Sequence, residues 1–384
     1  MPAILRVRKG GHMYYEDDFE KEFHDELEFH KYLDEVEQRG EWMRVPSRSL
    51  KVLTIAKNEQ ECTPVDGTDM EALTKDTKGH TGLLLKLPEG VYQLGTTAIK
   101  TLKGRARVDG NALADVDKAV LADILNKCLR VSKGKALIRF CEGKIRAVLS
   151  GDEKDYAILS MPEVYMVSSA YINGDYQKAV FQMGYADHYR TAAVWELEDE
   201  RLSEAYQELM EQYGRQASEK LRAAVRITTS DVGASGANIF YSLKGADQII
   251  ILGEALKLRH KDCKTIKDFE ENIQSIFDYY KEVLRDVMRL CSIHVSYPLN
   301  AMAGIMNKAG FGKKLIAETV ENYKAAAGDA PCSAYEVYCG ICEVVSIARQ
   351  SGEDERSLLR LEEKIAKCIS RRWHDYDIPG DVKY

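Results

Sequence analysis

Groups of basic residues are the side chains in this sequence most able to bind a ligand. They fall before, within and after segments with strand-like patterns: Lys103, Arg105, Arg107, Arg130, Lys133, Lys135, Arg139, Lys144, Arg146, Lys257 and Arg259. A groove of Lys and Arg neutralises phosphates, and aromatic rings beside it can stack on bases, so we predict a site for single-stranded nucleic acid. The candidate stacking residues are Phe140, Tyr171, Tyr176 and Tyr241. The alternative is an ordinary solvated sheet face whose lysines protect an edge.

Pairs of carboxylates suggest a different chemistry, a metal-dependent nuclease. Three pairs could hold Mg²⁺: Glu196 with Glu198, Asp231 with Glu254, and Asp152 with Glu153. Solvated carboxylates are the commoner outcome. Asp187 and His188 are adjacent, but no serine or cysteine completes a recognisable catalytic motif with them. We therefore predict no catalytic residues, no bound metal and no cofactor, and favour a protein that is not an enzyme.

Two further motifs have a functional and a structural interpretation. Cys339 and Cys342 have the spacing of half a zinc site, or they are small buried residues of a helix. The turn at residues 230–236 offers backbone N–H groups that could cradle an anion, but it matches no phosphate-binding motif. We favour the structural interpretation of both.

Composition limits the class of protein. The 384 residues are 45% hydrophobic and 30% charged, as in soluble globular proteins. No apolar run approaches the roughly 20 residues of a membrane helix. An odd number of cysteines, nine, favours free thiols in a reducing compartment, so we expect a cytoplasmic protein. The net charge of -7 argues against coating of duplex DNA, although local basic patches can outweigh it.

The pattern of strands and helices predicts an α+β fold, in which an antiparallel meander sheet packs against helices and a helical C-terminal region follows. Runs at residues 225–229, 238–243 and 248–252 predict the meander, and residues 137–149 predict a hairpin turning at Glu142-Gly143-Lys144. Residues 58–82 read as a long loop and Asn173-Gly174 as a hairpin turn. Acidic residues, with apolar residues at helical spacing among them, predict an acidic N-terminal arm at residues 1–47 that is either helical or flexible. A mixed α+β domain at residues 48–262 and a helical region at residues 263–384 should follow it.

Four blocks of the sequence resemble an uncharacterised phage/plasmid-like protein family, a domain of unknown function found in phages, prophages and plasmids. The blocks are residues 92–98 with 125–127, residues 136–150, residues 229–260, and residues 333–338 with 361–362. Their order, across residues 83–371, carries the resemblance. The family usually has a cysteine and Asn-Gly after its central hairpin, which residues 248–252 lack. The resemblance implies a mobile-element context and brings no agreed activity or catalytic residues.

These observations lead to three functional hypotheses. The first is a mobile-element protein that binds nucleic acid without catalysis, such as a single-strand-binding or annealing accessory in replication or recombination. The second is a host-directed factor, such as an anti-defence protein, whose acidic arm imitates the charge of nucleic acid. The third is the nuclease. The expected partners are single-stranded nucleic acid or a host protein, with no membrane, in the host-cell cytoplasm. Self-association into a homo-oligomer stays open.

Overall fold

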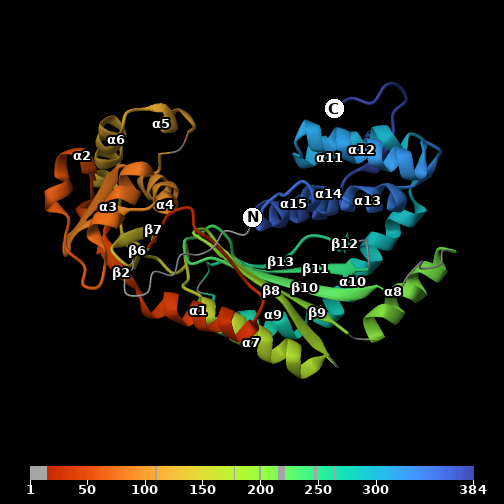
Figure 1. The fold of residues 1–384 in the computed structure, drawn as a ribbon, viewed down its shortest axis with the longest axis horizontal. Coiled ribbons are helices and arrows are strands. Elements are labelled where there is room, and N and C mark those ends of the chain that lie inside the picture. Colours follow the sequence, from red (N-terminus) through yellow and green to blue (C-terminus); the bar gives the residue numbers. More distant parts are fainter. Residues whose placement is uncertain are drawn as a thin grey trace.

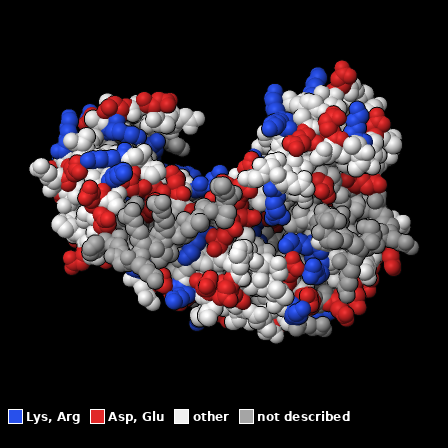
Figure 2. Space-filling model, viewed as in Figure 1, with Lys and Arg blue, Asp and Glu red and all other residues white. Residues whose placement is uncertain are grey.

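The molecule has a central sheet from which two lobes rise on either side (Figure 1), and the space-filling view shows a hollow between them (Figure 2). This computed structural model describes residues 15–108, 110–176, 178–198, 200–214, 221–245, 249–260, 262 and 264–384. The fold is α+β, as predicted. We call the central sheet and the helices beneath it the body, residues 40–150 the N-terminal lobe, and residues 294–384 the C-terminal lobe.

The large sheet is the antiparallel meander that the sequence predicted. In spatial order its strands are β1 (Glu20–Phe23), β8 (Ala179–Asp187), β9 (Thr191–Leu197), β10 (Arg222–Thr229), β11 (Ala237–Lys244) and β12 (Ile249–Ile251), and β13 (Leu256–Leu258) also pairs with β11. Within the described residues, consecutive strands from β8 to β12 are neighbours and run antiparallel. Residue 248 of the predicted third run lies outside the described part.

The two faces of this sheet differ because successive residues of a strand point to opposite sides. On β10, Val225 and Ile227 belong to the hydrophobic core, whereas Arg226 and Thr228 point to the other face. The body helices cover the apolar face (Figure 1): α1 (Glu26–Gln38), α7 (Met161–Asp175), α8 (Glu200–Gln212), α9 (Ile266–Gln274) and α10 (Ile276–Met288). The polar face is turned toward the lobes.

The N-terminal lobe contains a second sheet with its own core. Its strands lie in the order β2 (Gly40–Pro46), β6 (Lys135–Cys141), β7 (Lys144–Ser150), β5 (Gly90–Leu94), β4 (Leu83–Leu87) and β3 (Lys51–Thr54). The predicted hairpin is β6 and β7, whose turn needs the positive φ of Glu142 (47°) and Gly143 (83°). The lobe's helices are α2 (Ile55–Asn58), α3 (Met70–Gly79), α4 (Thr96–Ala106), α5 (Ala112–Asp115) and α6 (Lys118–Val131). The hairpin therefore belongs to a different sheet from the meander.

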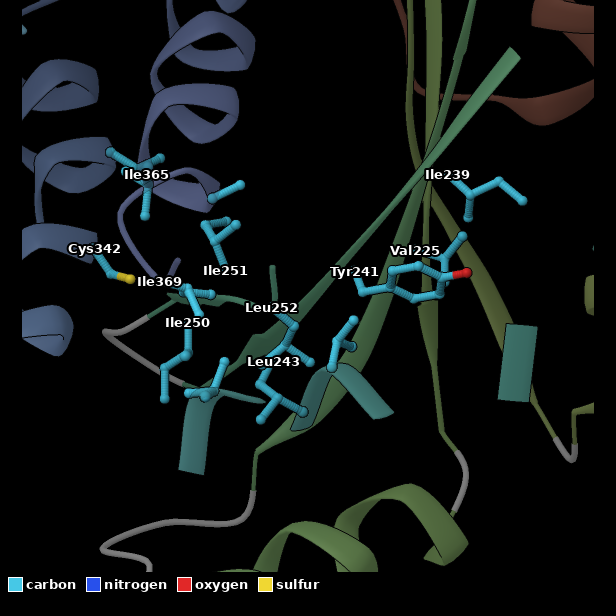
Figure 3. Packing of buried hydrophobic residues seen from close by; sticks show 14 of the residues in the cluster. Val225, Ile239, Tyr241, Leu243, Ile250, Ile251, Leu252, Cys342, Ile365 and Ile369 are labelled. Atoms are coloured by element: carbon cyan, nitrogen blue, oxygen red, sulfur yellow. The ribbon is translucent and has the colours of Figure 1, made fainter. Parts of the chain in front are cut away.

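The C-terminal lobe is helical, as predicted. Its elements are β14 (His294–Val295), α11 (Pro298–Ala309), α12 (Lys313–Ala327), β15 (Cys332–Ser333), α13 (Ala334–Cys342), α14 (Val344–Gln350) and α15 (Glu355–Ala366). Single 3₁₀ turns lie at Ser47–Ser49, Glu59–Glu61, Arg289–Ser292 and Trp373–Asp375. Figure 3 shows how this lobe joins the large sheet: Ile365, Ile369 and Cys342 pack beside Ile250 and Ile251 of β12. One hydrophobic core thus runs from the body into the C-terminal lobe.

The segment expected to be a separate acidic arm is built into both sheets. Within residues 15–47, β1 pairs with β8 and β2 pairs with β6, and residues 1–14 lie outside the described part. Helix α1 starts at its N-cap Asp25, and Phe29 and Leu33 are fully buried. An apolar stripe four residues apart gives the helix a face that must be covered, so an otherwise acidic segment docks on the core.

Two local predictions were wrong for a similar reason. Residues 58–82 contain α3, which Asp69 caps by accepting a hydrogen bond from the Ala72 backbone N–H and which buries Leu73. Asn173-Gly174 is the last turn of α7 and not a hairpin turn, because Val164, Tyr165 and Ile172 bury one helical face. Tertiary packing overrode the local turn signal in both cases. None of the helices in the described residues combines the length and apolar character needed to cross a membrane.

Replacing Phe29 by Ala should lower the free energy of unfolding by about 3–5 kcal/mol, because it empties a closely packed buried site. Phe29 packs edge-on against Phe23 and Tyr165, with ring centroids 5.3 and 5.0 Å away. Leu27→Ala is the matched control, since Leu27 lies on the same helix and is 77% exposed. Urea unfolding followed by tryptophan fluorescence measures both variants. Equal stability of the two would show that α1 does not belong to the core.

Candidate functional site

The N-terminal lobe joins the body through a buried carboxylate shared by two arginines. Asp231, just after β10, accepts hydrogen bonds from Arg139 Nε at 2.9 Å and Arg146 Nη1 at 2.5 Å. Arg139 Nη2 also donates to Glu37 Oε2 of α1 at 3.0 Å. Arg139 is 0% exposed, Arg146 3% and Asp231 4%. Burial alone would raise the pKa of Asp231, but Arg146 and Arg139 outweigh it and the pKa is lowered.

A β-bulge lets both arginines reach one oxygen. In the β6–β7 hairpin Arg139 opposes Ala147 and Phe140 opposes Ile145, so Arg146 is the extra residue without an opposite partner. A bulge locally re-aims side chains. The expectation that Arg139 and Arg146 come together is met, but they meet on a buried carboxylate and not on an open face.

A second buried ion cluster lies beside the first and was missed in the sequence. Lys144 Nζ donates to Asp17 Oδ2 at 3.1 Å and, in a shorter contact, to Asp76 Oδ2. Asp17, Asp76 and His80 could together hold a metal ion, and no other group in the described residues has that spacing. The Lys144 ammonium already supplies the positive charge between the two carboxylates, so we interpret the cluster as structural.

The segment at Asp17 and Asp18 also contacts the body. Asp18, held at a positive φ of 61°, places one carboxylate oxygen 3.0 Å from His80 Nε2 and the other 3.2 Å from His188 Nε2. The next contact reaches the C-terminal lobe, where Arg356 Nε lies 2.9 Å from Asp187 Oδ2. Asp187 and His188, which complete no catalytic motif in the sequence, therefore lie where the N-terminal segment, the body and the C-terminal lobe meet.

Helix α15 covers part of the polar sheet face through further ion pairs. Arg190 Nη1 donates to Glu363 Oε1 at 2.7 Å, and Arg226 pairs with Glu362. The Arg226 guanidinium lies 4.1 Å from the centroid of the Phe240 ring, and burial lowers its pKa to about 9. A cavity of about 10 Å³, room for about one water molecule, lies between Arg146 of the N-terminal lobe and body residues that include Arg190 and Asp231.

Three of the predicted nucleic-acid ligands are therefore unavailable. Arg139, Lys144 and Arg146 are buried and paired because α4 and α6 cover one face of the hairpin and the body covers the other. The aromatic residues expected to stack on bases are not exposed for stacking either. Phe140, Tyr176 and Tyr241 are buried, and Tyr171 donates a hydrogen bond from its hydroxyl to the Gln274 carbonyl.

Six of the predicted cations, four exposed and two (Lys103 and Arg105) half-buried, form one group, which we call the N-lobe cationic surface. It comprises Lys103, Arg105, Arg107, Arg130, Lys133 and Lys135. They stand at the C-terminal ends of α4 and α6 and in the turn that enters β6. Arg105 joins these segments by donating to the Ser47 hydroxyl at 2.7 Å and to the Lys133 carbonyl. Within the described chain, none of the six forms an ion pair with a carboxylate.

The remaining two predicted cations belong to the body and not to the N-terminal lobe. Lys257 belongs to β13 of the body, where its ammonium is 3.3 Å from Glu254. Arg259 follows β13 and is exposed. The eleven residues thus divide among a buried joint, an exposed surface and a separate strand end.

The carboxylates considered as metal ligands are all engaged. Glu196 binds Lys244 and Arg222, Glu198 binds Lys178, Glu254 binds Lys257, Glu153 binds Arg44, and Asp152 accepts from the Lys154 backbone. Each of these carboxylates therefore already has a cationic or backbone partner, and none belongs to the one group of three or more possible metal ligands in the described residues. Among the described residues, the cysteines likewise form no metal-ligand group; Cys342 is buried in α13, and burial raises the pKa of its thiol.

In the turn at residues 230–236, the Ser230 hydroxyl already accepts hydrogen bonds from the Val232 and Ala234 backbone N–H groups, so these two groups are not available to an anion.

Only one sequence signal could have identified the missed cluster. Asp76 and His80 are four residues apart, which places them on one face of a helix. The interpretation of that segment as a loop concealed the signal. Nothing in the order of residues links Asp17 or Lys144 to them.

Comparison with known proteins adds no relative: no family model, no curated protein and no solved structure matches the chain. The site is therefore interpreted from its own geometry.

Replacing Asp231 by Asn should lower the free energy of unfolding by about 3–5 kcal/mol, because it leaves two buried guanidinium groups without their shared counter-charge. The matched control is Asp329→Asn, at an exposed carboxylate. Urea unfolding of both variants tests this. A loss below about 1 kcal/mol for Asp231→Asn, typical of a surface pair, would contradict the joint.

Lowering the pH from 7 to 5 should reduce the contribution of His260 to the free energy of unfolding. His260 stacks on Tyr156, with ring centroids 5.2 Å apart, and burial lowers its pKa. Below its ordinary pKa of about 6.5 the unfolded chain therefore takes up a proton that the folded chain does not. Asp231 acts in the same sense at lower pH: its contribution is full above its unfolded pKa of about 3.9 and is lost as the pH falls through its lowered folded pKa.

Urea unfolding at pH 5, 6 and 7 measures this dependence. His260→Gln should show a smaller decline than the wild type, while the exposed control His24→Gln should not differ from it. The decline persists in part because burial also lowers the pKa of His188. Identical profiles for wild type and His260→Gln would contradict the role of His260.

Proposed function

We propose that the protein binds the phosphate backbone of nucleic acid through the N-lobe cationic surface. The observation that carries the proposal is that six Lys and Arg side chains gather on one lobe without ion-pair partners among the described residues. Each phosphate contact of this kind releases counterions, which gives binding its affinity and its salt dependence. The mobile-element context implied by the resemblance is part of the same proposal.

The local arrangement of charge explains how an acidic protein can do this. The chain has 61 acidic and 54 basic residues, excluding histidine. Carboxylates such as Asp231, Asp76 and Glu362 neutralise buried cations where the N-terminal lobe meets the body and where α15 covers the large sheet. Exposed charges separated by more than about 8–10 Å are largely screened at physiological salt, so a local surface acts by its own sign.

The same geometry argues for recognition of the backbone and against recognition by stacking. The aromatic residues expected to stack on bases lie in the cores or are half-buried. Proteins that hold single strands without sequence preference gain about 1–3 kcal/mol per base from such stacking. The N-lobe cationic surface has charge without these rings, so it fits phosphates of any sequence.

A host-directed protein interaction is the second candidate, and one surface favours it. Helix α1 presents exposed carboxylates at Asp25, Glu28 and Asp34 while its other side is buried. This fixed acidic face suits a basic partner protein. Recovery of one stoichiometric host protein by the wild type, and its loss on Glu28→Lys with Asp34→Lys, would support this candidate.

Fluorescence anisotropy with labelled duplex and single-stranded DNA at low salt tests nucleic-acid binding. Lys133→Ala with Lys135→Ala should weaken binding and reduce the slope of log K against log salt by about 1.8 for duplex, because each lost contact removes about 0.9. The control is Lys31→Ala with Lys267→Ala, two exposed lysines on body helices. No detectable binding by the wild type at micromolar protein would refute the proposal.

A further inference from the structure

The C-terminal lobe carries a second exposed cationic surface, which the proposed function leaves unused. It consists of three lysines beside the turn between α11 and α12: Lys308, Lys313 and Lys314. In the described part of the protein, none of these three ammonium groups lies within ion-pair distance of a carboxylate. We call this group the C-lobe cationic surface.

The turn that presents these lysines is held in place. Gly310 ends α11 with a positive φ of 84°, and its carbonyl accepts a hydrogen bond from Lys364 Nζ of α15 at 2.6 Å. The Lys364 ammonium also lies over the Phe311 ring, 5.6 Å from its centroid. Lys364 therefore fixes the turn, and the three surface lysines project from a rigid support.

Two of these lysines stand where they weaken their own helix. Lys313 and Lys314 occupy the first turn of α12, which contains no acidic residue and has no side-chain cap. A cation in the first turn opposes the helix dipole and reduces helix stability. Helix stability therefore does not explain why two lysines occupy this turn. A negatively charged ligand bound beside them would explain their position.

The two lobes face each other across the hollow. Figure 2 shows Lys and Arg side chains on the front of the N-terminal lobe, at the base of the hollow, and on the side of the C-terminal lobe that faces it. Acidic side chains are interspersed, so the positive character is confined to local groups. A ligand that contacts the cationic groups of both lobes must therefore carry negative charge at separated positions.

We propose that one nucleic-acid duplex spans the hollow and places phosphates on both the N-lobe and the C-lobe cationic surfaces. This inference rests on the proposed function and adds the form of its ligand. A duplex carries a negative charge about every 1.7 Å along its axis and stays stiff over about 150 base pairs. It can therefore bridge separated surfaces without the loss of conformational entropy that a flexible strand would pay. A single strand lacks this stiffness, and Phe311, the ring at the C-lobe surface, is 6% exposed and offers no stacking platform.

Anisotropy titrations with a duplex of about 20 base pairs and with its single strand, over a series of salt concentrations, test the proposal. The variants are Lys133→Ala/Lys135→Ala, Lys313→Ala/Lys314→Ala, all four together, and the Lys31→Ala/Lys267→Ala control. Each pair should reduce the duplex salt slope by about 1.8 and the fourfold variant by about 3.6, with one duplex bound per protein. Lys313→Ala/Lys314→Ala should keep or raise the melting temperature, because it removes cations from the first turn of α12.

The outcomes separate this inference from the proposed function. If Lys313→Ala/Lys314→Ala binds like the control while Lys133→Ala/Lys135→Ala is weakened, the spanning duplex is overturned and the proposed function stands. Two duplexes per protein, or tighter binding of the single strand, would also overturn it. If the wild type binds neither nucleic acid, the proposed function fails first and the inference fails with it.

Discussion

The need to neutralise buried charge at Asp231 governs how the two sheets meet. A carboxylate and two guanidinium groups removed from water are stable only when they are paired. Arg139 and Arg146 come from the N-terminal lobe, while Asp231 comes from the body, so neither part can satisfy these groups alone. The lobe has its own hydrophobic core, and its placement on the body depends on this polar contact.

The same requirement is met at two further places in the molecule. Lys144 is buried against Asp17 and Asp76, and α15 sets Glu362 and Glu363 on the arginines of the polar sheet face. Ion pairs in the interior specify one geometry, because a displaced partner leaves an isolated charge. Charge pairing therefore joins the N-terminal lobe to the body, whereas the C-terminal lobe is held to the large sheet by ion pairs from α15 and by apolar packing against β12.

This use of charge sorts the basic residues into two kinds. Those within the joints are neutralised and hold the fold together, and those at helix ends and turns stay free to meet a ligand. The proposed nucleic-acid surface consists of the second kind alone. Burial, which composition does not reveal, decides to which kind a given Lys or Arg belongs.

Periodicity was sufficient to predict much of the fold. The alternating runs of the meander, the hairpin with Glu142 and Gly143 at its turn, and the C-terminal helices follow local rules that act over a few residues. Local rules failed where distant segments supplied the missing face. Residues 15–47 belong to two sheets because Phe29 and Leu33 are buried in the hydrophobic core of the body. Asn173-Gly174 is helical because α7 packs on the large sheet.

The amino-acid sequence by itself determined the strand and helix periods, the turns that need positive φ, and the presence of basic groups. Only the tertiary structure decided that Arg139, Lys144 and Arg146 are buried while Lys133 and Lys135 are exposed. The physical reason is that a charge is neutralised by whatever lies near it in space. Asp231 and Asp17 come within reach of these cations only through contacts between residues about 85 to 127 positions apart in the chain.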